Sequence, residues 1–276
     1  MSEDATFPLR TEKISKLLVS YSLPAITSMV IFSLYNIIDS IFIGHGVGPL
    51  GIAGIAVSFP IMNLNIAFSV LVGVGGASKA SILLGEENLE GASRVLGNVL
   101  VLGLILGAVI GGGMALFLDQ ILAGFGASPD VLPYAREFMQ IILLGLPVSY
   151  TLFNLNHLIR ASGHPQKAML TIIVTVVVNI ILAPIFIFML NWGMRGAALA
   201  TVAAQFTGMI WVVVHFLNRD KLLHFKAGIY RLRMDSLRAI FSIGAAPFLV
   251  HHLASGLVAA IIMQRRTHRG GLAVRA

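Results

Sequence analysis

The chain has 276 residues, of which 57% are hydrophobic and only 11% are charged, and its mean hydropathy is +0.89. These values exclude a soluble globular domain, in which about a quarter of the residues are charged. The formal net charge of +7 needs no nucleic-acid partner, because basic loops that face anionic membrane lipid account for it. The sequence therefore predicts an integral membrane protein.

Seven apolar runs are each long enough for a transmembrane helix, which needs about 20 apolar residues. The predicted fold class is therefore all-α, a polytopic membrane helix bundle of about seven transmembrane helices. The first run is too long for the apolar region of a signal peptide and lacks a small-residue cleavage site, so we expect it to be retained. The seven runs are residues 17–43, 50–78, 95–118, 133–159, 168–192, 197–217 and 239–263.

The first run contains a carboxylate that lipid alone does not explain. Between Leu17 and Ile43, Asp39 is the only formally charged residue. An ionisable side chain inside a span costs about 2.5–3.5 kcal/mol and normally faces the bundle interior or a wet cavity, which makes it a functional candidate. Tyr35 and Asn36 lie within one helical turn of Asp39, so we expect the three side chains to share a face and to hydrogen-bond together.

Later runs carry glycines and further polar side chains. Gly103, Gly107 and Gly111 form a stripe in the third run where another helix can approach closely. In the fifth and sixth runs, Asn179, Thr201 and Gln205 lie at about the depth of Asp39 or deeper. Together with Tyr35, Asn36 and Asp39 they predict a polar pocket in the outer half of the membrane. The alternative is that Asp39 reaches the interface or caps the turn at Gly44, and that the other polar side chains only join helices.

Two ions suit such a pocket. Burial favours the neutral form of a carboxyl group, so Asp39 could exchange a proton. Hydroxyl and amide oxygens around a carboxylate also suit sodium, which makes Asp39 a candidate metal ligand. The residues leave this choice open. Either ion would neutralise Asp39 and favour one helix arrangement over another. The absence of cysteine excludes thiolate metal sites.

A basic segment separates the seventh run from the first six. Residues 219–238 form the longest linker, and beyond it LRAIFSIGAAPFLV resembles KLLVSYSLPAITS near the start of the chain. Such weak internal symmetry is typical of transporters built from repeated bundles. We therefore expect a six-helix lobe at 1–218, a cytoplasmic linker at 219–238, and the first helix of an incomplete second lobe, with a basic tail, at 239–276.

The basic residues also predict an orientation. Up to Arg238, the lysines and arginines between the runs fall on the side of the N-terminus, except for Arg136 and Arg195. Because such residues accumulate on the cytoplasmic side, we expect a multi-pass protein of the plasma (inner) membrane with a cytoplasmic N-terminus. The arginines after the seventh run depart from this rule.

Four stretches together resemble the multidrug and toxic compound extrusion (MATE) family over nearly all of residues 10–260. The resemblance implies two six-helix lobes around a cavity, cation-coupled export of organic, often cationic, compounds, and no organic cofactor. It also implies that the chain covers about the first lobe, so that another chain could supply a second. The four stretches are YNIIDSIFIG, LIRASGHPQKAM, NIILAPIFIF and GAALATVAAQ.

The same resemblance assigns roles to positions of this chain. Asp39 matches the family's first-helix acid, Tyr35 the tyrosine before it, Asn179 the fifth-helix asparagine and Thr201 the sixth-helix threonine. Ala183 stands where a second acid is frequent, which leaves one carboxylate. The C-terminal MQRRTHRGGLAVRA also departs from the family pattern, and a truncated or frame-shifted gene would explain it.

The leading hypothesis is an antiporter that exports drug-like compounds. Its cation-binding residues would be Asp39, Tyr35, Asn36, Asn179 and Thr201, with Gln205 and Tyr35 contacting substrate. The alternatives are an inactive fragment of such a transporter and a lipid-linked sugar flippase, which would line its cavity with basic residues. An enzyme is not expected, since the runs contain no paired acids and no nucleophile with a base. A retinal-binding receptor is disfavoured because residues 239–263 contain no lysine.

Overall fold

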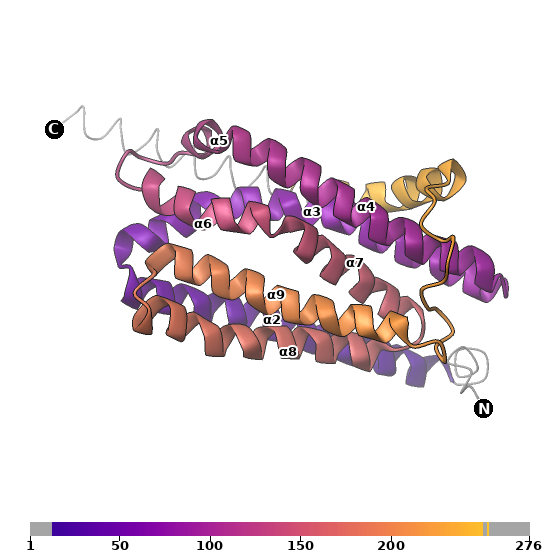
Figure 1. Ribbon diagram of the computed structural model, residues 1–276. Coiled ribbons are helices and arrows are strands. Elements are labelled where there is room, and N and C mark those ends of the chain that lie inside the picture. Colours follow the sequence, from indigo (N-terminus) through magenta and orange to yellow (C-terminus); the bar gives the residue numbers. More distant parts are fainter. Residues whose placement is uncertain (1–12, 251–252, 254–276) are drawn as a thin grey trace.

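A computed structural model describes residues 13–250 and Leu253, and within them every regular element is a helix. This confirms the predicted all-α membrane bundle. In chain order the elements are α2 (Ile14–Gly46), α3 (Pro49–Gly85), α4 (Leu89–Leu116), α5 (Leu118–Gly124), α6 (Leu132–Leu144), α7 (Leu146–Ala161), α8 (Pro165–Pro184), the π-helix η1 (Ile185–Met189) and α9 (Gly193–Leu217). A further helix occupies 234–250 (Figure 1).

The first six predicted runs correspond to these helices. In the part of the chain that the structure describes, five helices, counting α8 with η1 as one, are long and apolar enough to span a membrane, and α6 with α7, which are bent by 56°, make a sixth when the pair is counted as one span. The bend falls at Gly145 and Pro147, where proline removes a backbone donor and the carbonyl of Leu143 loses its helical partner. The seventh run, 239–263, begins inside the helix at 234–250, and its remainder lies outside the described residues.

The glycine stripe in α4 allows close contact with α7. A Cβ added at Gly107 would lie 2.7 Å from the Cα of Pro147, and one at Gly111 would lie 2.4 Å from the carbonyl oxygen of Leu143. Gly103 makes similar room for the side chain of Asn154. The stripe therefore fits α4 against the bend between α6 and α7.

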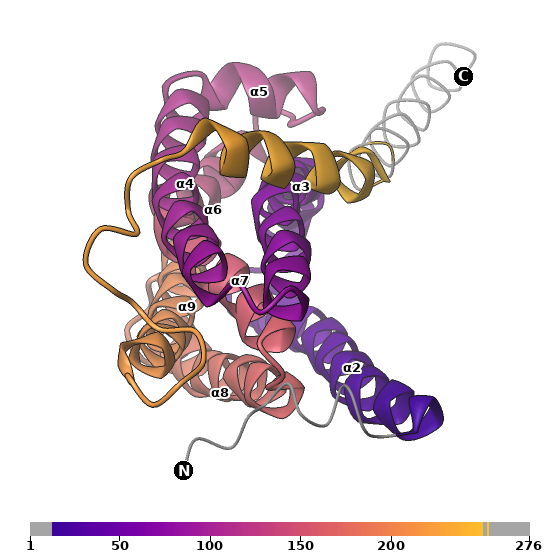
Figure 2. The same cartoon turned by 90° about the vertical axis from the view of Figure 1, so that its right-hand side faces the viewer.

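The linker after α9 runs along the bundle to the end of α4 that begins at Leu89. The amide of Phe225 donates to the carbonyl of Phe216 at 2.8 Å, and Ile229 is buried against Gly97. The helix at 234–250 then lies across α3 and α4 (Figure 2). It approaches α3 so closely that a Cβ at Gly244 would lie 1.9 Å from the carbonyl oxygen of Leu71. The expected domain boundaries at 218 and 238 stay a prediction.

The six spans differ in how many of their residues are buried. Buried apolar residues mainly of α3, α4, α7 and α9 form one core. A second core contains residues of α3, α5, α6, α7, the end of α8 with η1, and the start of α9, and α2 contributes only Ile43 to it. By contrast, α2 lies at the edge of the bundle and packs mainly against α8 (Figure 2). Its buried residues are Pro24, Ser28, Asp39 and Ile43. The predicted functional acid is therefore on the least enclosed of the long helices.

Candidate functional site around Asp39

Asp39 faces protein although α2 lies at the edge of the bundle. Only 8% of its surface is exposed, and in the described part of the chain its Oδ1 atom is buried without a hydrogen-bond partner. Tyr35 lies one turn away on the same side of α2, close enough for the two groups to interact electrostatically. A buried carboxylate oxygen without a donor is costly, so the site favours an arriving proton or cation.

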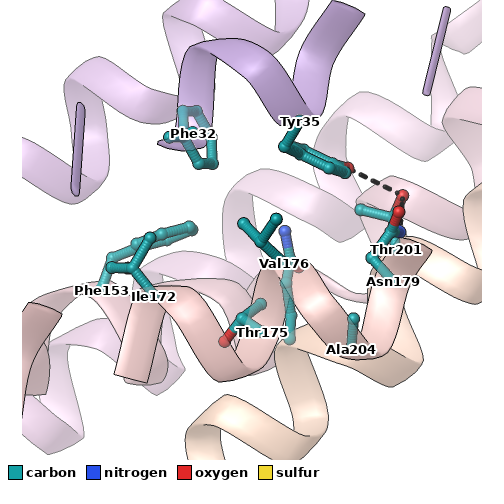
Figure 3. Close-up of a pocket in the computed structure, with 10 residues that line it drawn as sticks. Phe32, Tyr35, Phe153, Ile172, Thr175, Val176, Asn179, Thr201 and Ala204 are labelled. Carbon is teal, nitrogen blue, oxygen red and sulfur yellow. Dashed lines mark hydrogen bonds between the residues drawn. The ribbon is translucent and has the colours of Figure 1, made fainter. Parts of the chain in front are cut away.

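One helical turn before Asp39, at Tyr35, the helices α2, α8 and α9 are linked through Thr201. The Tyr35 hydroxyl lies 3.2 Å from the Thr201 hydroxyl, and the Asn179 amide donates to the same oxygen at 3.3 Å. Thr201 in turn donates to the carbonyl of Ala197 at 3.1 Å. Since a threonine hydroxyl has one proton, Tyr35 must be the donor in its bond to Thr201. The structure therefore brings these three side chains together, and Figure 3 shows them at one end of a small cavity.

The cavity beside Thr201 has a volume of about 20 Å³. This is room for about one water molecule, whereas a drug-sized ligand needs several hundred Å³. Its lining residues are Phe32, Tyr35, Phe153, Ile172, Thr175, Val176, Asn179, Thr201, Ala204 and Gln205 (Figure 3). In this conformation the lobe can enclose a water or a small ion between α2, α7, α8 and α9.

Gln205 lines this cavity, and its side chain already forms a hydrogen bond with α7. Its side-chain oxygen accepts a hydrogen bond from the Ser149 hydroxyl of α7. Phe153, also on α7, meets Phe32 edge to face with ring centroids 6.4 Å apart. Sequence reasoning missed Ser149, Phe153 and Phe32, although Phe32 lies one turn before Tyr35 on the same face. Nothing in the sequence pointed to Ser149 and Phe153 of α7, because serine and phenylalanine are ordinary residues in a membrane helix.

Asn36 lies apart from this group. Its amide donates to the carbonyl of Phe32 at 2.7 Å and is exposed. It borders a different feature, an open groove of about 680 Å³ where α2 meets the start of α3. The expected hydrogen bonding among Tyr35, Asn36 and Asp39 is not formed, because Tyr35 bonds to Thr201 and Asn36 donates to the carbonyl of Phe32.

A second polar cluster lies between α3 and α7. Asn154 is fully buried and accepts a hydrogen bond from Ser69 at 3.0 Å, and the Tyr150 hydroxyl donates to the backbone carbonyl of Asn65 at 2.9 Å. Both side-chain polar atoms of Asn65 and the amide nitrogen of Asn154 lack partners within the described residues. The cluster contains no carboxylate, so it differs in kind from the site at Asp39.

The ligand chemistry around Asp39 is that of one acid and neutral oxygens. Ala183, where the family resemblance led us to look for a second acid, is completely buried in the second core. Among the described residues, no three side chains of the His, Asp or Glu type gather as a metal site. A cation at Asp39 would therefore be held by one carboxylate.

The fold and this site define a class of protein. A bundle of up to six membrane spans that includes bent or broken helices and one buried acid is typical of a lobe of a membrane transporter. A model of the MatE family matches residues 24–185. The chain belongs to this family, whose named relatives are export proteins and transporters rather than enzymes, and the resemblance of the four sequence stretches is confirmed.

Three known proteins illustrate the relationship. The multidrug export protein MepA of Staphylococcus haemolyticus is 30% identical over 91% of this chain and 55% of its own length. A crystal structure of MATE in the bent conformation superposes with a TM-score of 0.84 at 28% identity, covering 90% of this chain and 55% of that one. An outward-facing multidrug resistance MATE transporter of the MOP superfamily gives 0.83 at 28% identity, over 91% and 55%. The chain thus spans about half the length of the relatives it matches.

Proposed function

We propose that this chain forms the cation-coupling lobe of an antiporter that exports organic, drug-like compounds. The observation that carries the proposal is the buried Asp39, with an unpartnered oxygen, one turn from the linked side chains of Tyr35, Asn179 and Thr201. The names of its relatives, which include multidrug export proteins, supply the class of substrate. The N-terminus would be cytoplasmic in the plasma membrane, following the distribution of lysine and arginine.

The hydrogen bonds of Thr201 favour a proton over sodium as the coupling ion. Its oxygen already accepts from Tyr35 and Asn179 and donates to Ala197. A sodium ion at this oxygen would have to displace one of these bonds, because a hydroxyl oxygen has two lone pairs. A proton needs only the free oxygen of Asp39. Asn36 is exposed and could join only if α2 turned.

Protonation would then change how α2 is held. The neutral acid no longer needs a polar environment, so the equilibrium between helix arrangements shifts by the difference in its interactions. Substrate contact at Gln205 and Tyr35 requires α2 to move away from α8 and α9, because the closed cavity holds about one water. The proposed cycle therefore alternates a protonated, closed site with an ionised, open one.

Proteoliposomes containing the full 276-residue chain test the proposal. We expect an imposed proton gradient to drive export of a fluorescent organic cation, and Asp39→Asn to abolish it while leaving the thermal unfolding temperature unchanged. Asn36→Ala is the matched control, since it lies on the same helix outside the cavity, and should retain transport. If the D39N protein still exports the fluorescent cation when a proton gradient is imposed, the proposed role of Asp39 is wrong.

A second candidate function is a chain that binds a proton at Asp39 without transporting, because the unpartnered oxygen within the described residues suits a proton whether or not export follows. Hydrogen–deuterium exchange of α2, measured across a pH series, separates the two. Protection factors of α2, which are corrected for the intrinsic pH dependence of amide exchange, that change with pH in the wild type but not in D39N, without any export, would support this reading. A lipid-linked sugar flippase is disfavoured, because none of the residues lining the cavity is basic.

A further inference from the structure

Four basic side chains from three segments gather at one end of the bundle. His164 precedes α8, Lys167 is in its first turn, His215 is in the last turn of α9, and Lys221 is in the linker that follows. The rings of His164 and His215 are 5.3 Å apart. The ammonium groups of Lys167 and Lys221 lie close enough to repel each other. Figure 1 shows α7 ending, α8 beginning and α9 ending at this same end of the bundle.

The backbone holds this basic cluster in place. The carbonyl of His164 accepts hydrogen bonds from the amides of Lys167 and Ala168 at 3.1 and 3.2 Å, which starts α8. On the linker, Leu223 is almost fully buried, and the bond between Phe225 and Phe216 anchors the segment to α9. Lys221 is therefore positioned beside α8 by packing rather than by a long free loop.

The cluster carries an excess of positive charge. Within the described part of the chain, neither Lys167 nor Lys221 forms an ion pair, and the pairs there lie elsewhere, such as Arg136 with Asp119. Burial, followed by the charge of Lys167, lowers the pKa of His164, and Lys221 adds to the effect. Like charges held together are unfavourable unless an anion lies between them. The positive end of the α8 dipole acts in the same direction.

An exposed apolar track continues from Lys167 along α8. Leu170, Val177 and Ile181 follow it at helical spacing on one face, and they are 44%, 48% and 57% exposed. The cluster lies at a helix end, where membrane headgroups are found, and the track runs from there toward the bilayer centre. We propose that Lys167 and Lys221 bind the phosphate group of an anionic phospholipid, with an acyl chain along this track. The basic bias of this side places that lipid in the cytoplasmic leaflet.

Native mass spectrometry of the full chain in detergent tests the site. Phosphatidylglycerol is titrated against phosphatidylcholine, and inorganic phosphate is added as a competitor. We expect phosphatidylglycerol to bind more tightly than phosphatidylcholine, and K167Q/K221Q to weaken it about thirty-fold, from the usual contribution of a lysine near anionic lipid. The control K79Q/K226Q removes the same charge elsewhere and should change binding less than about two-fold.

Three outcomes would overturn the proposal. These are equal losses in both double variants, no preference for phosphatidylglycerol in the wild type, and displacement of the lipid by inorganic phosphate at equal concentration, which would assign the site to free phosphate. If K167Q/K221Q does not fold, K221Q alone serves, because Lys221 lies in the linker outside the spans. A loss of binding in K221Q that the single variant K226Q does not share supports the site.

Discussion

The helices α2 and α3 are neighbours in the chain and similar in length and hydropathy, yet they are held very differently. Four residues of α2 are buried, compared with fifteen of α3. The buried acid is on the loosely held helix, and the neutral polar residues Asn65 and Ser69 are on the tightly held one. The acid that we propose to gain and lose a proton therefore lies on the helix whose movement would disturb the least packing.

The difference divides the lobe into two parts: a closely packed scaffold of α3, α4 and α7, and α2, the proposed sensor. In the scaffold, α3, α4 and α7 meet through glycines and buried leucines, so a small shift would cost many contacts at once. In the sensor, α2 is tied to α8 and α9 near the cavity through Tyr35 and Thr201. Hydrogen bonds between membrane helices contribute only about 0.6 kcal/mol on average. Under the proposed function, such a bond is weak enough to break and re-form when Asp39 changes its protonation state.

The largest effect is expected from filling the scaffold. Gly107→Val places side-chain atoms where the backbone of Pro147 already lies, so α4 and α7 must separate. We expect a loss of about 1–3 kcal/mol, and a thermal unfolding temperature lower by roughly 2–4 °C for each kcal/mol. Gly112→Val is the matched control on the same helix, because a Cβ there meets nothing within 4 Å. Equal unfolding temperatures for the two variants would contradict the tight packing of α4 on α7.

A smaller effect of opposite sign is expected at Asn65. Its side-chain oxygen and nitrogen are buried and have no partner among the described residues, so Asn65→Leu removes two unsatisfied groups at similar volume. The variant should be about 1–2 kcal/mol more stable to thermal unfolding. Asn63→Leu is the control, because the Asn63 amide donates to the carbonyl of Phe59. A less stable N65L protein would show instead that a water or ion bound between α3 and α7 satisfies the asparagine.

The sequence predicts the spanning helices more completely than it predicts the side chains around the cavity. Apolar runs longer than 20 residues predict spanning helices whatever their partners, so all the described spans were found. The cluster of Tyr35, Asn179 and Thr201 followed from polar residues at the depth of Asp39 or deeper and from the family resemblance. The side chains that α7 contributes did not, because the direction of Ser149 and Phe153 depends on the bend at Pro147, and a sequence does not give its angle.

Asn36 shows the limit of helical periodicity. Residues three and four positions before Asp39 flank its face on opposite sides, and the neighbouring helix decides which side is buried. Because α8 covers the side of Tyr35, Asn36 is left at the groove next to α3. The position of a helix in a bundle is a property of the whole fold, so periodicity alone predicts the face but not its partner.

The smallest effect is expected from Tyr35→Phe. The change removes one hydroxyl, and with it the hydrogen bond from α2 to Thr201, but keeps the ring next to Phe32. Stability to thermal unfolding should fall by about 0.6 kcal/mol. Because this bond ties α2 to α9, hydrogen–deuterium exchange should rise in α2 and stay constant in α3, whereas Asn36→Ala should leave both unchanged. Faster exchange in both helices would show that α2 is part of the scaffold, and the separation between a fixed bundle and a movable acid-bearing helix would then be lost.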